Sequence, residues 1–241
     1  MNTIKFEHKQ KPLMVAHRGL SGIETENTAA AFVAAGNRSY FGIECDIHKT
    51  KDGKYAVIHD RDTLRVSGEE LHVADCTLEE LRAITLRDKA TGTNTRADLL
   101  IPSLEEYVTI CRTYGKHCVL ELKDDFSKED ILEIVSIIEK LDYLESVTFI
   151  SFRYQNLVFL REDYPTQSAQ FLKSQWEDDM IERLTAYHLD LDINHKNLTR
   201  EIVATCHQNG IIVNTWTVNK PEAAETLADW GVDQITTNIL E

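Results

Sequence analysis

The sequence predicts an α/β fold, a TIM (β/α)8 barrel, on three observations. Short apolar runs alternate with amphipathic, helix-like segments along the 241 residues. Nine of the runs are typical of strands, and a hairpin signal explains the one that exceeds the eight strands of such a barrel. No stretch rich in Pro, Gly or Ser and no shift in composition divides the chain, so residues 1–241 are predicted to form one domain. On the pattern alone, a doubly wound parallel sheet is the second choice.

Nine runs are predicted to be strands because they are rich in Val, Ile and aromatic residues. Several are almost continuously apolar, which is typical of parallel strands that are covered on both faces. The nine runs are residues 13–17, 43–48, 55–59, 118–123, 147–152, 166–172, 188–193, 211–218 and 234–237.

The run at 55–59 is predicted to be the returning strand of a hairpin. It follows the run at 43–48 after only KTKDGK, in which Asp52-Gly53 is a turn signal. A parallel partner would need a crossover of about a dozen residues or more. Without this excursion, eight strands separated by helical segments remain.

The segments between the runs carry helix signals. Residues 25–28 lead into AAAFVAAGN, and Ser103 and Ser127 each open an amphipathic stretch with an acidic residue three positions later, as in a capping box. The last helix has Pro221 in its first turn and Gly231 after its end. Later helices are expected near 153–162, 175–186, 197–208 and 220–230. Residues 61–102 are the least regular part and are expected to form a small insertion over one rim of the barrel.

Composition limits the partners and the compartment. There are 26 basic and 40 acidic residues, for a net charge of −14, which argues against a general binder of nucleic acid or of anionic membranes. The five cysteines are odd in number and show no CxxC spacing, which argues against a disulfide framework. No signal peptide and no long apolar run is apparent, so a reduced, cytoplasmic protein without stable membrane insertion is expected.

Acidic residues interrupt two of the apolar runs. Glu44 and Asp46 alternate and therefore point to one face of their strand, and Glu121 and Lys123 do the same on another. Burying carboxylates without compensation is costly. Convergence of Glu44, Asp46 and Glu121 on one hard cation, Mg²⁺ or Ca²⁺, would offset that cost. An ion-pair network with Arg18 or Lys123 and no metal would offset it as well, and the spacing alone does not choose between the two.

Two histidines stand where strands are predicted to end. His17 closes the first run and His59 the hairpin strand, and barrel active sites are built at this end of the strands. The ordinary pKa of imidazole, near 6.5, suits proton transfer at neutral pH. The pair is therefore predicted to act as acid and base.

The polar residues fall into an ordered set of motifs. The segments are AHRGLSGIETENTAAAF, GIECDIHKTKDGKYAVIHD, IPSLEEYV, VLELK, SF and VNTWTVNKPEAAETLADWGVDQITTN. The set resembles the glycerophosphodiester phosphodiesterase family, in its compact bacterial form, from about residue 13 to 238. HRG or ExD alone is a weak signal, whereas the ordered set is highly specific.

The resemblance implies a TIM barrel that uses a divalent cation to hydrolyse small glycerophosphodiesters to glycerol phosphate and an alcohol. It assigns Glu44, Asp46 and Glu121 as metal ligands, His17 and His59 as the acid/base pair, Arg18 and Lys123 as phosphate-binding cations, and Trp216 as a wall of the glycerol or alcohol side. His17 is the expected base and His59 the expected acid. The C2 hydroxyl of glycerol lies next to the phosphorus and can attack first, giving a cyclic phosphate that water then opens.

Two other functions compete with this one. A phospholipase D-like lyase on the same barrel would make a cyclic phosphate from lipid and would favour an exposed apolar rim loop. A non-catalytic binding module would tolerate the loss of a histidine or a ligand, but all of these residues are present.

Some positions depart from the family pattern. Thr25 stands where the family usually has Pro, and Glu26 and Asn27 are expected to cap the first helix rather than to brace the site. The printed chain has no helical segment after residues 237–241, so either residues 1–12 or a partner copy in a homodimer is expected to cover that face of the barrel.

Five further polar residues lie near the predicted site. His48 shares the face of Asp46, Asp60 is expected to orient a loop, and Ser151 to form strand-end hydrogen bonds. Asp190 and Asp192 alternate on one strand, either inward behind the site or at the mouth of the barrel.

Overall fold

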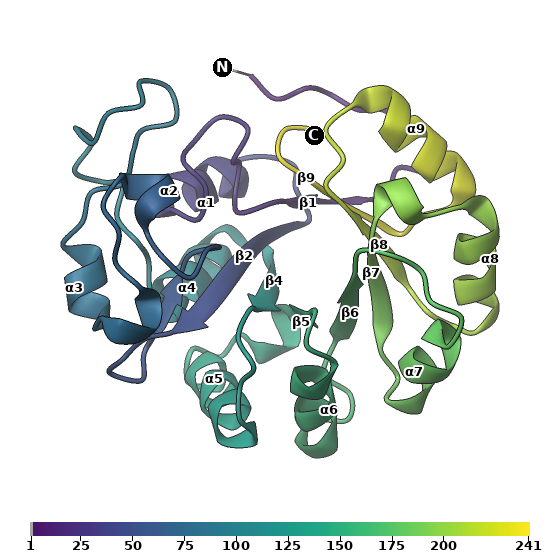
Figure 1. Ribbon diagram of the computed structural model, residues 1–241. Helices are drawn as coiled ribbons and strands as arrows, with labels where there is room; N and C mark the ends of the chain where they lie inside the picture. The colour runs from purple at the N-terminus through teal and green to yellow at the C-terminus, as the bar shows by residue number, and fades with distance from the viewer. Residues whose placement is uncertain (1) are drawn as a thin grey trace.

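Eight parallel strands close into a barrel surrounded by helices in the computed structural model, which describes residues 2–241 (Figure 1). Their order is β1-β2-β4-β5-β6-β7-β8-β9, and β9 returns to pair with β1. This closure confirms the TIM barrel and excludes the doubly wound sheet. The strands are β1 Leu13–Ala16, β2 Gly42–Lys49, β4 His117–Leu122, β5 Val147–Ser151, β6 Ala169–Lys173, β7 Asp190–Asn194, β8 Val213–Trp216 and β9 Gln234–Thr237.

All nine predicted strands exist, and those on the β5 to β8 side are shorter than expected. The expected strand 188–193 begins only at Asp190 because His188 has a positive φ of 51° and belongs to the preceding turn. Inside the barrel, Val15, Val119, Ile150 and Leu172 pack together. This inner layer closes the bore below the polar residues of the mouth.

The predicted hairpin is confirmed. Strand β3 (Tyr55–Val57) pairs antiparallel with the end of β2, with Ile47 opposite Val57. It extends β2 beyond the barrel, so that the residues just after β3 return to the mouth.

The helices cover the outside of the barrel. They are α1 Ala29–Gly36, α4 Leu104–Tyr114, α5 Lys128–Lys140, α6 Tyr154–Asp163, α7 Met180–Ala186, α8 Arg200–Gln208 and α9 Pro221–Trp230. The capping boxes at Ser103 and Ser127 are confirmed, as is the stop of α9 at Gly231, whose φ is 87°. Helix α7 begins five residues later than expected; Glu177, ahead of it, pairs with both Lys173 and Arg183.

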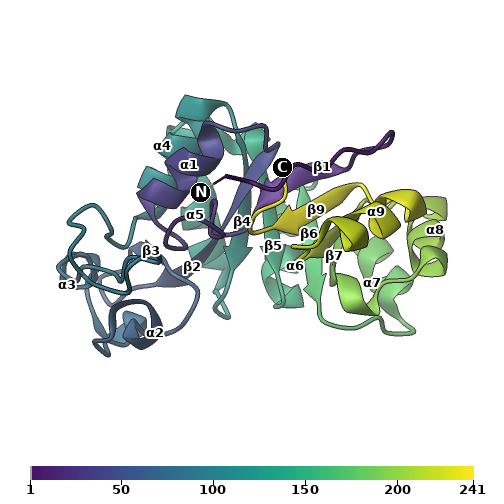
Figure 2. The same ribbon diagram turned by 90° about the horizontal axis from the view of Figure 1, so that it is seen from above.

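Residues 61–102 contain only short helices: α2 Leu64–Ser67, the 3-10 turn Val73–Asp75 and α3 Leu78–Arg82. They bury their own apolar cluster, which includes Leu81 and Leu99 and packs on the hairpin through Ala56 and Ile58. Figure 2 shows α2 and α3 beside β2 and β3, projecting to one side of the barrel.

The segment before β1 covers the end of the chain that follows β9. Ile4 forms a parallel bridge with Leu240, and the Phe6 amide donates to the Glu241 carbonyl at 2.7 Å. Phe6 is only 2% exposed. Either the N-terminal residues or a partner copy was expected to cover this face of the barrel, and the structure shows the N-terminal residues in contact with it. No helix within residues 2–241 has the length and apolarity needed to cross a bilayer.

Candidate active site

The polar residues predicted from the sequence meet at the carboxyl ends of the barrel strands. A cavity of about 230 Å³ opens there. Its wall includes His17, Arg18, Glu44, His59, Glu121 and Lys123, and Asp46 lies directly behind it, in contact with Arg18 and Lys123. Strand alternation brings these side chains to the inside, because β1, β2 and β4 are neighbours in the ring.

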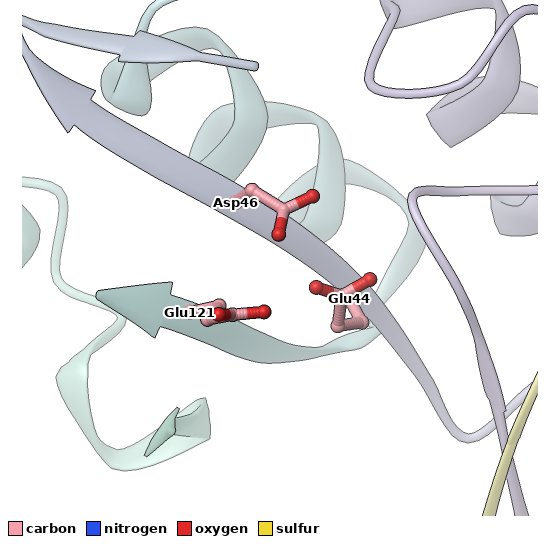
Figure 3. Close-up of side chains that lie close together, drawn as sticks. All are labelled: Glu44, Asp46 and Glu121. Atoms are coloured by element: carbon pink, nitrogen blue, oxygen red, sulfur yellow. The ribbon is translucent and has the colours of Figure 1, made fainter. Parts of the chain in front are cut away.

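Three carboxylates point toward one another in this wall (Figure 3). Glu44 and Asp46 come from β2, and Asp46 lies directly across from Glu121 on β4. One oxygen of each lies within 4.8 Å of the others, and all three residues are buried. The predicted convergence is confirmed.

Two cationic side chains lie on these carboxylates. The Lys123 Nζ is 2.9 Å from Glu121 and 3.3 Å from Asp46, and the Arg18 Nε is 3.3 Å from Asp46. The ion-pair network exists, but two cations do not balance three carboxylates.

The pKa values show where the imbalance falls. Burial raises the pKa of Asp46, but Arg18 and Lys123 outweigh it and hold the pKa below its ordinary value. Burial, reinforced by the charge of Asp46, raises the pKa of Glu44 well above its ordinary value and that of Glu121 to about 8. The Asp46 Oδ1 atom is buried, with the Lys123 Nζ at 3.3 Å and no hydrogen bond within residues 2–241. An all-oxygen donor set with excess negative charge fits a hard divalent cation.

His17 is held by an amide. Its Nδ1 lies 2.7 Å from the Asn238 Oδ1, which also accepts from the Ser21 hydroxyl at 3.0 Å. An amide oxygen only accepts, so with the Asn238 oxygen assigned to this position the Nδ1 carries the proton. The lone pair is then on Nε2, 4.0 Å from Glu44. Burial and the charge of Arg18 lower the pKa of His17 to about 4. The imidazole is therefore neutral at pH 7.

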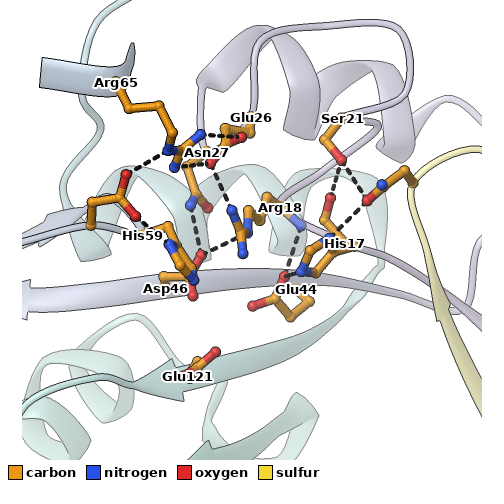
Figure 4. A network of polar contacts seen from close by, with 12 residues as sticks. His17, Arg18, Ser21, Glu26, Asn27, Glu44, Asp46, His59, Arg65 and Glu121 are labelled. Carbon is orange, nitrogen blue, oxygen red and sulfur yellow. Dashed lines mark hydrogen bonds and ion pairs between the residues drawn. The ribbon is translucent and has the colours of Figure 1, made fainter. Parts of the chain in front are cut away.

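His59 is held by a carboxylate. Its Nδ1 lies 2.6 Å from the Asp60 Oδ1, and the other Asp60 oxygen accepts from the Arg65 Nε at 2.5 Å (Figure 4). Burial, with the charges of Arg18 and Lys123, lowers the pKa of His59 below its ordinary value, although Asp46 and the Asp60 hydrogen bond act in the opposite direction. The two imidazoles thus have different backing groups, although both line the same cavity.

The loop after β1 braces the site, contrary to the capping role expected for Glu26 and Asn27. Thr28 is the N-cap of α1. The Asn27 Nδ2 donates to Asp46 at 2.8 Å, and Glu26 pairs with Arg18 at 2.8 Å and with Arg65. In the sequence ETENT, Glu26, Asn27 and Thr28 all lie just before α1, so the sequence allowed either capping or bracing. In the structure, the Thr28 hydroxyl caps the start of α1.

Aromatic rings form the opposite wall. Trp216 lines the cavity from the end of β8 and meets Phe152 edge to face, with ring centroids 5.8 Å apart. The His195 Nδ1 lies 3.1 Å from the Trp216 carbonyl. Trp216 therefore lines the cavity together with Phe152, and its role as a wall of the glycerol or alcohol side stays a prediction.

The further polar residues that the sequence places near the site each have identifiable contacts. His48 bonds to Asp124 at 2.8 Å and to the His59 carbonyl at 3.0 Å. The Ser151 hydroxyl donates to the Leu122 carbonyl, as expected for a strand end. Of the undecided pair on β7, Asp192 is buried and lines the cavity, whereas Asp190 accepts from the Ile212 amide outside it.

Sequence reasoning missed three contacts. Asn238, Asp60 and Asn27 bond to His17, His59 and Asp46. Asp60 stands next to His59 in HD, and Asn27 lies in ENT, so the motifs held the signal for these two. Nothing near His17 in sequence points to Asn238, 221 positions away.

A barrel with three converging carboxylates, two imidazoles and two cations at the carboxyl ends of its strands defines a class: (β/α)8-barrel enzymes with a divalent-metal site suited to phosphate esters. Comparison with known proteins gives the family. Residues 17–241 match the glycerophosphoryl diester phosphodiesterase family, and the chain belongs to it. Hydrolysis of glycerophosphodiesters to glycerol phosphate and an alcohol is the activity of this family, and the chain is an enzyme of it.

Individual relatives agree over nearly the whole chain. A glycerophosphodiester phosphodiesterase of Caldanaerobacter subterraneus subsp. tengcongensis is 31% identical over 95% of this chain and 94% of its own. One of Bacillus altitudinis is 29% identical over 92% of this chain and 93% of its own. A solved phosphodiesterase of Oleispira antarctica, in complex with the product sn-glycerol-3-phosphate, superposes with a TM-score of 0.86 at 26% identity, covering 95% of this chain and 93% of that one.

Proposed function

We propose that the cavity hydrolyses small glycerophosphodiesters with His17 and His59 as the acid/base pair. One observation carries the proposal: two imidazoles, three carboxylates, Arg18 and Lys123 converge on one cavity of about 230 Å³. That volume suits a glycerol phosphate unit rather than a lipid. The product in the Oleispira antarctica structure, sn-glycerol-3-phosphate, supports the same substrate class.

Glu44, Asp46 and Glu121 would hold the cation, Mg²⁺ or Ca²⁺, because their oxygens converge and carry excess charge. When bound, the cation supplies positive charge that stabilises the phosphoryl oxygens as negative charge develops on them.

Arg18 and Lys123 would bind the phosphate. Arg18 can grip two phosphate oxygens, whereas Lys123 acts as a point charge. The loop contacts hold Arg18 in place, since its guanidinium spans Glu26 and Asp46. The Lys123 ammonium lies between Asp46 and Glu121. Because Lys123 also lines the cavity, its ammonium can contact a phosphate bound there.

His17 is the base and His59 the acid of the first step. His17 is neutral with its lone pair on Nε2, so it can take the proton of the attacking hydroxyl as the new O–P bond forms. His59, backed by the Asp60 carboxylate, can carry a proton and deliver it to the leaving alkoxide as the old P–O bond breaks. If the C2 hydroxyl attacks, a cyclic phosphate forms, and water opens it with the two imidazoles exchanging roles.

Three further expectations belong to this proposal. The whole of residues 1–241 acts as one domain, with residues 61–102 anchoring the site through Arg65, which bonds to Glu26 and Asp60. A cytoplasmic location and a homodimer remain predictions. The lyase alternative predicts a cyclic product that is released rather than opened.

The test is an assay of the purified protein on a panel of glycerophosphodiesters, with and without chelator. His17→Ala and His59→Ala are each expected to lower kcat by about 100-fold or more, since general acid–base catalysis contributes at least this much. His207→Ala, an exposed histidine on α8 paired with Asp233, is the matched control and should keep full activity.

Each part of the proposal has its own contrary result. Activity that is indifferent to chelation would remove the metal. Undiminished turnover in both cavity variants would remove the acid/base pair. A cyclic phosphate as the only end product would favour the lyase.

A further inference from the structure

Two polar groups on the wall opposite the carboxylates have no role in the chemistry above. Asp192 on β7 is 2% exposed, and its Oδ1 is buried without a hydrogen-bond partner among the described residues. The indole Nε1 of Trp216 on β8 is likewise unpartnered within residues 2–241. Both residues line the same cavity, from adjacent strands. A buried acceptor and a buried donor left free at one cavity wall require an explanation.

The neighbours of Asp192 do not satisfy it. In register it lies between Leu172, which has no polar atom, and Asn214. The Asn214 amide donates to Gln170, and its oxygen accepts from the Thr215 amide and the Thr236 hydroxyl. The inner network is therefore closed without Asp192, whose remaining partner must come from the cavity.

The position of β7 in the barrel indicates which part of a bound substrate would lie next to Asp192. In the ring of eight, three strands separate β7 from β2 on either side, so Asp192 faces Glu44 and Asp46 across the bore. His59, the proposed acid, has a side chain that is 32% exposed, against 19% for His17. The leaving alcohol that His59 protonates therefore lies toward the open mouth. The glycerol unit, on the other side of the phosphorus, points inward to Asp192.

The pair of groups selects the chemistry of its ligand. A hydroxyl can donate to the Asp192 carboxyl and accept from the Trp216 indole N–H at the same time. An ammonium cannot accept from the indole, and a phosphate cannot donate to the carboxyl.

We propose that Asp192 and Trp216 bind the free terminal hydroxyl of the glycerol unit, C1, and so select diesters whose glycerol carries no acyl chain. This specificity role rests on the proposed function. An acyl chain at C1 would remove the hydroxyl donor and leave the buried carboxyl unpaired, a state that costs far more than a lost apolar contact. Specificity against acylated lipids is thus set at the floor of the barrel rather than by a rim loop.

The test crosses enzyme variants with substrate variants. The substrates are glycerophosphocholine and its 1-deoxy analogue, 2-hydroxypropyl phosphocholine, which keeps the C2 hydroxyl. In the unaltered enzyme, kcat/KM should be about 10- to 100-fold lower on the analogue. In Asp192→Leu this ratio should fall to about 3-fold or less, and Trp216→Phe, which keeps the ring but loses the N–H, should lower it in part. Asp190→Asn, on the same strand but outside the cavity, should keep the full ratio.

The outcomes separate the two proposals. No turnover of any glycerophosphodiester in the panel by the unaltered enzyme would overturn the proposed function. Turnover of both substrates at equal kcat/KM would leave the proposed function standing and overturn the role of Asp192 and Trp216. The unaltered enzyme decides this even if Asp192→Leu does not fold. A ratio of kcat/KM values that Asp192→Leu leaves unchanged would also overturn the role of Asp192.

Discussion

The two imidazoles differ in the chemical group that lies at their Nδ1 atom. Asn238 offers His17 an amide oxygen, and Asp60 offers His59 a carboxylate. Both hydrogen bonds raise the pKa of their imidazole, but an anionic partner stabilises the imidazolium more than a neutral one does. The proposed acid, His59, therefore has the charged partner, which agrees with the proposed division of roles between two identical side chains.

Asp60→Asn is expected to lower kcat about 10-fold or more and to move the alkaline limb of its pH profile to lower pH. The hydrogen bond to the Asp60 carboxylate raises the pKa of His59, so its loss lowers the pKa and reduces the protonated fraction at pH 7. Steady-state kinetics from pH 5 to 9 measure both effects. Asp62→Asn is the control, because among residues 2–241 the Asp62 side chain bonds only to the Leu64 amide. A lowered kcat with an unmoved alkaline limb in Asp60→Asn would mean that Asp60 has a structural role only.

The chemistry-bearing residues were predictable where strand alternation fixes them. Glu44 and Asp46 share a face because a strand has a period of two, and their meeting with Glu121 follows from barrel order. Asn238 was not predictable, because its contact with His17 depends on the closure of β9 onto β1. Asp192 was left undecided, since sequence does not say how deep a strand position lies.

At the scale of elements, the β1–α1 loop positions the residues that contact the carboxylates of β2. Arg18 has a positive φ of 53°, which directs its amide to Glu44 at 2.7 Å. Gly19 follows with φ +73°, and a Cβ there would lie 2.6 Å from the Ala31 carbonyl carbon in α1. The loop can therefore fold back on its own helix only with glycine at this position.

Gly19→Ala is expected to lower the free energy of unfolding by roughly 2–4 kcal/mol, because backbone strain and a forced contact with α1 add. Gly53→Ala is the matched control, since Gly53 has nearly the same φ, +74°, and nothing within 4 Å of its Cβ position. It should cost only about 1 kcal/mol. Urea unfolding followed by circular dichroism measures both. Equal losses would show that φ alone matters and that the loop can move away from α1.

Element types were predictable because local signals agreed with the fold. The Asp52-Gly53 turn fixed the hairpin, and the boxes at Ser103 and Ser127 fixed two helix starts. The errors lie at boundaries set by longer-range contacts. The late start of α7 is one, where Glu177 pairs with Lys173 and Arg183 ahead of the helix; the brace formed by Asn27 on Asp46 is another.

At the scale of the whole molecule, the two ends of the chain complete the barrel together. Ile4 forms a bridge with Leu240, and Figure 1 shows the C-terminus near β9 and β1. The Glu241 carboxylate accepts from the Thr3 hydroxyl and from the amide and hydroxyl of Ser39, and it pairs with Lys5 at 3.0 Å. One side chain thus joins the N-terminal segment, the α1–β2 loop and the last residue.

The Glu241 contacts predict a pH-dependent contribution to stability. Burial raises the pKa of Glu241, but the hydrogen bonds from Thr3, Ser39 and Lys5 outweigh it and lower the pKa from 4.5 to about 2. A folded-state pKa below the unfolded one stabilises the protein fully above about pH 4.5, and this stabilisation is lost as the pH falls toward 2. Glu241→Gln is therefore expected to lower the free energy of unfolding by on the order of 1–3 kcal/mol at pH 7, with roughly half or less of that difference left at pH 3. Thermal or urea unfolding at pH 7, 5 and 3 measures it, with Glu225→Gln on the exposed face of α9 as the control. A difference that stays constant across this range would show that the Glu241 contacts act through shape rather than through charge.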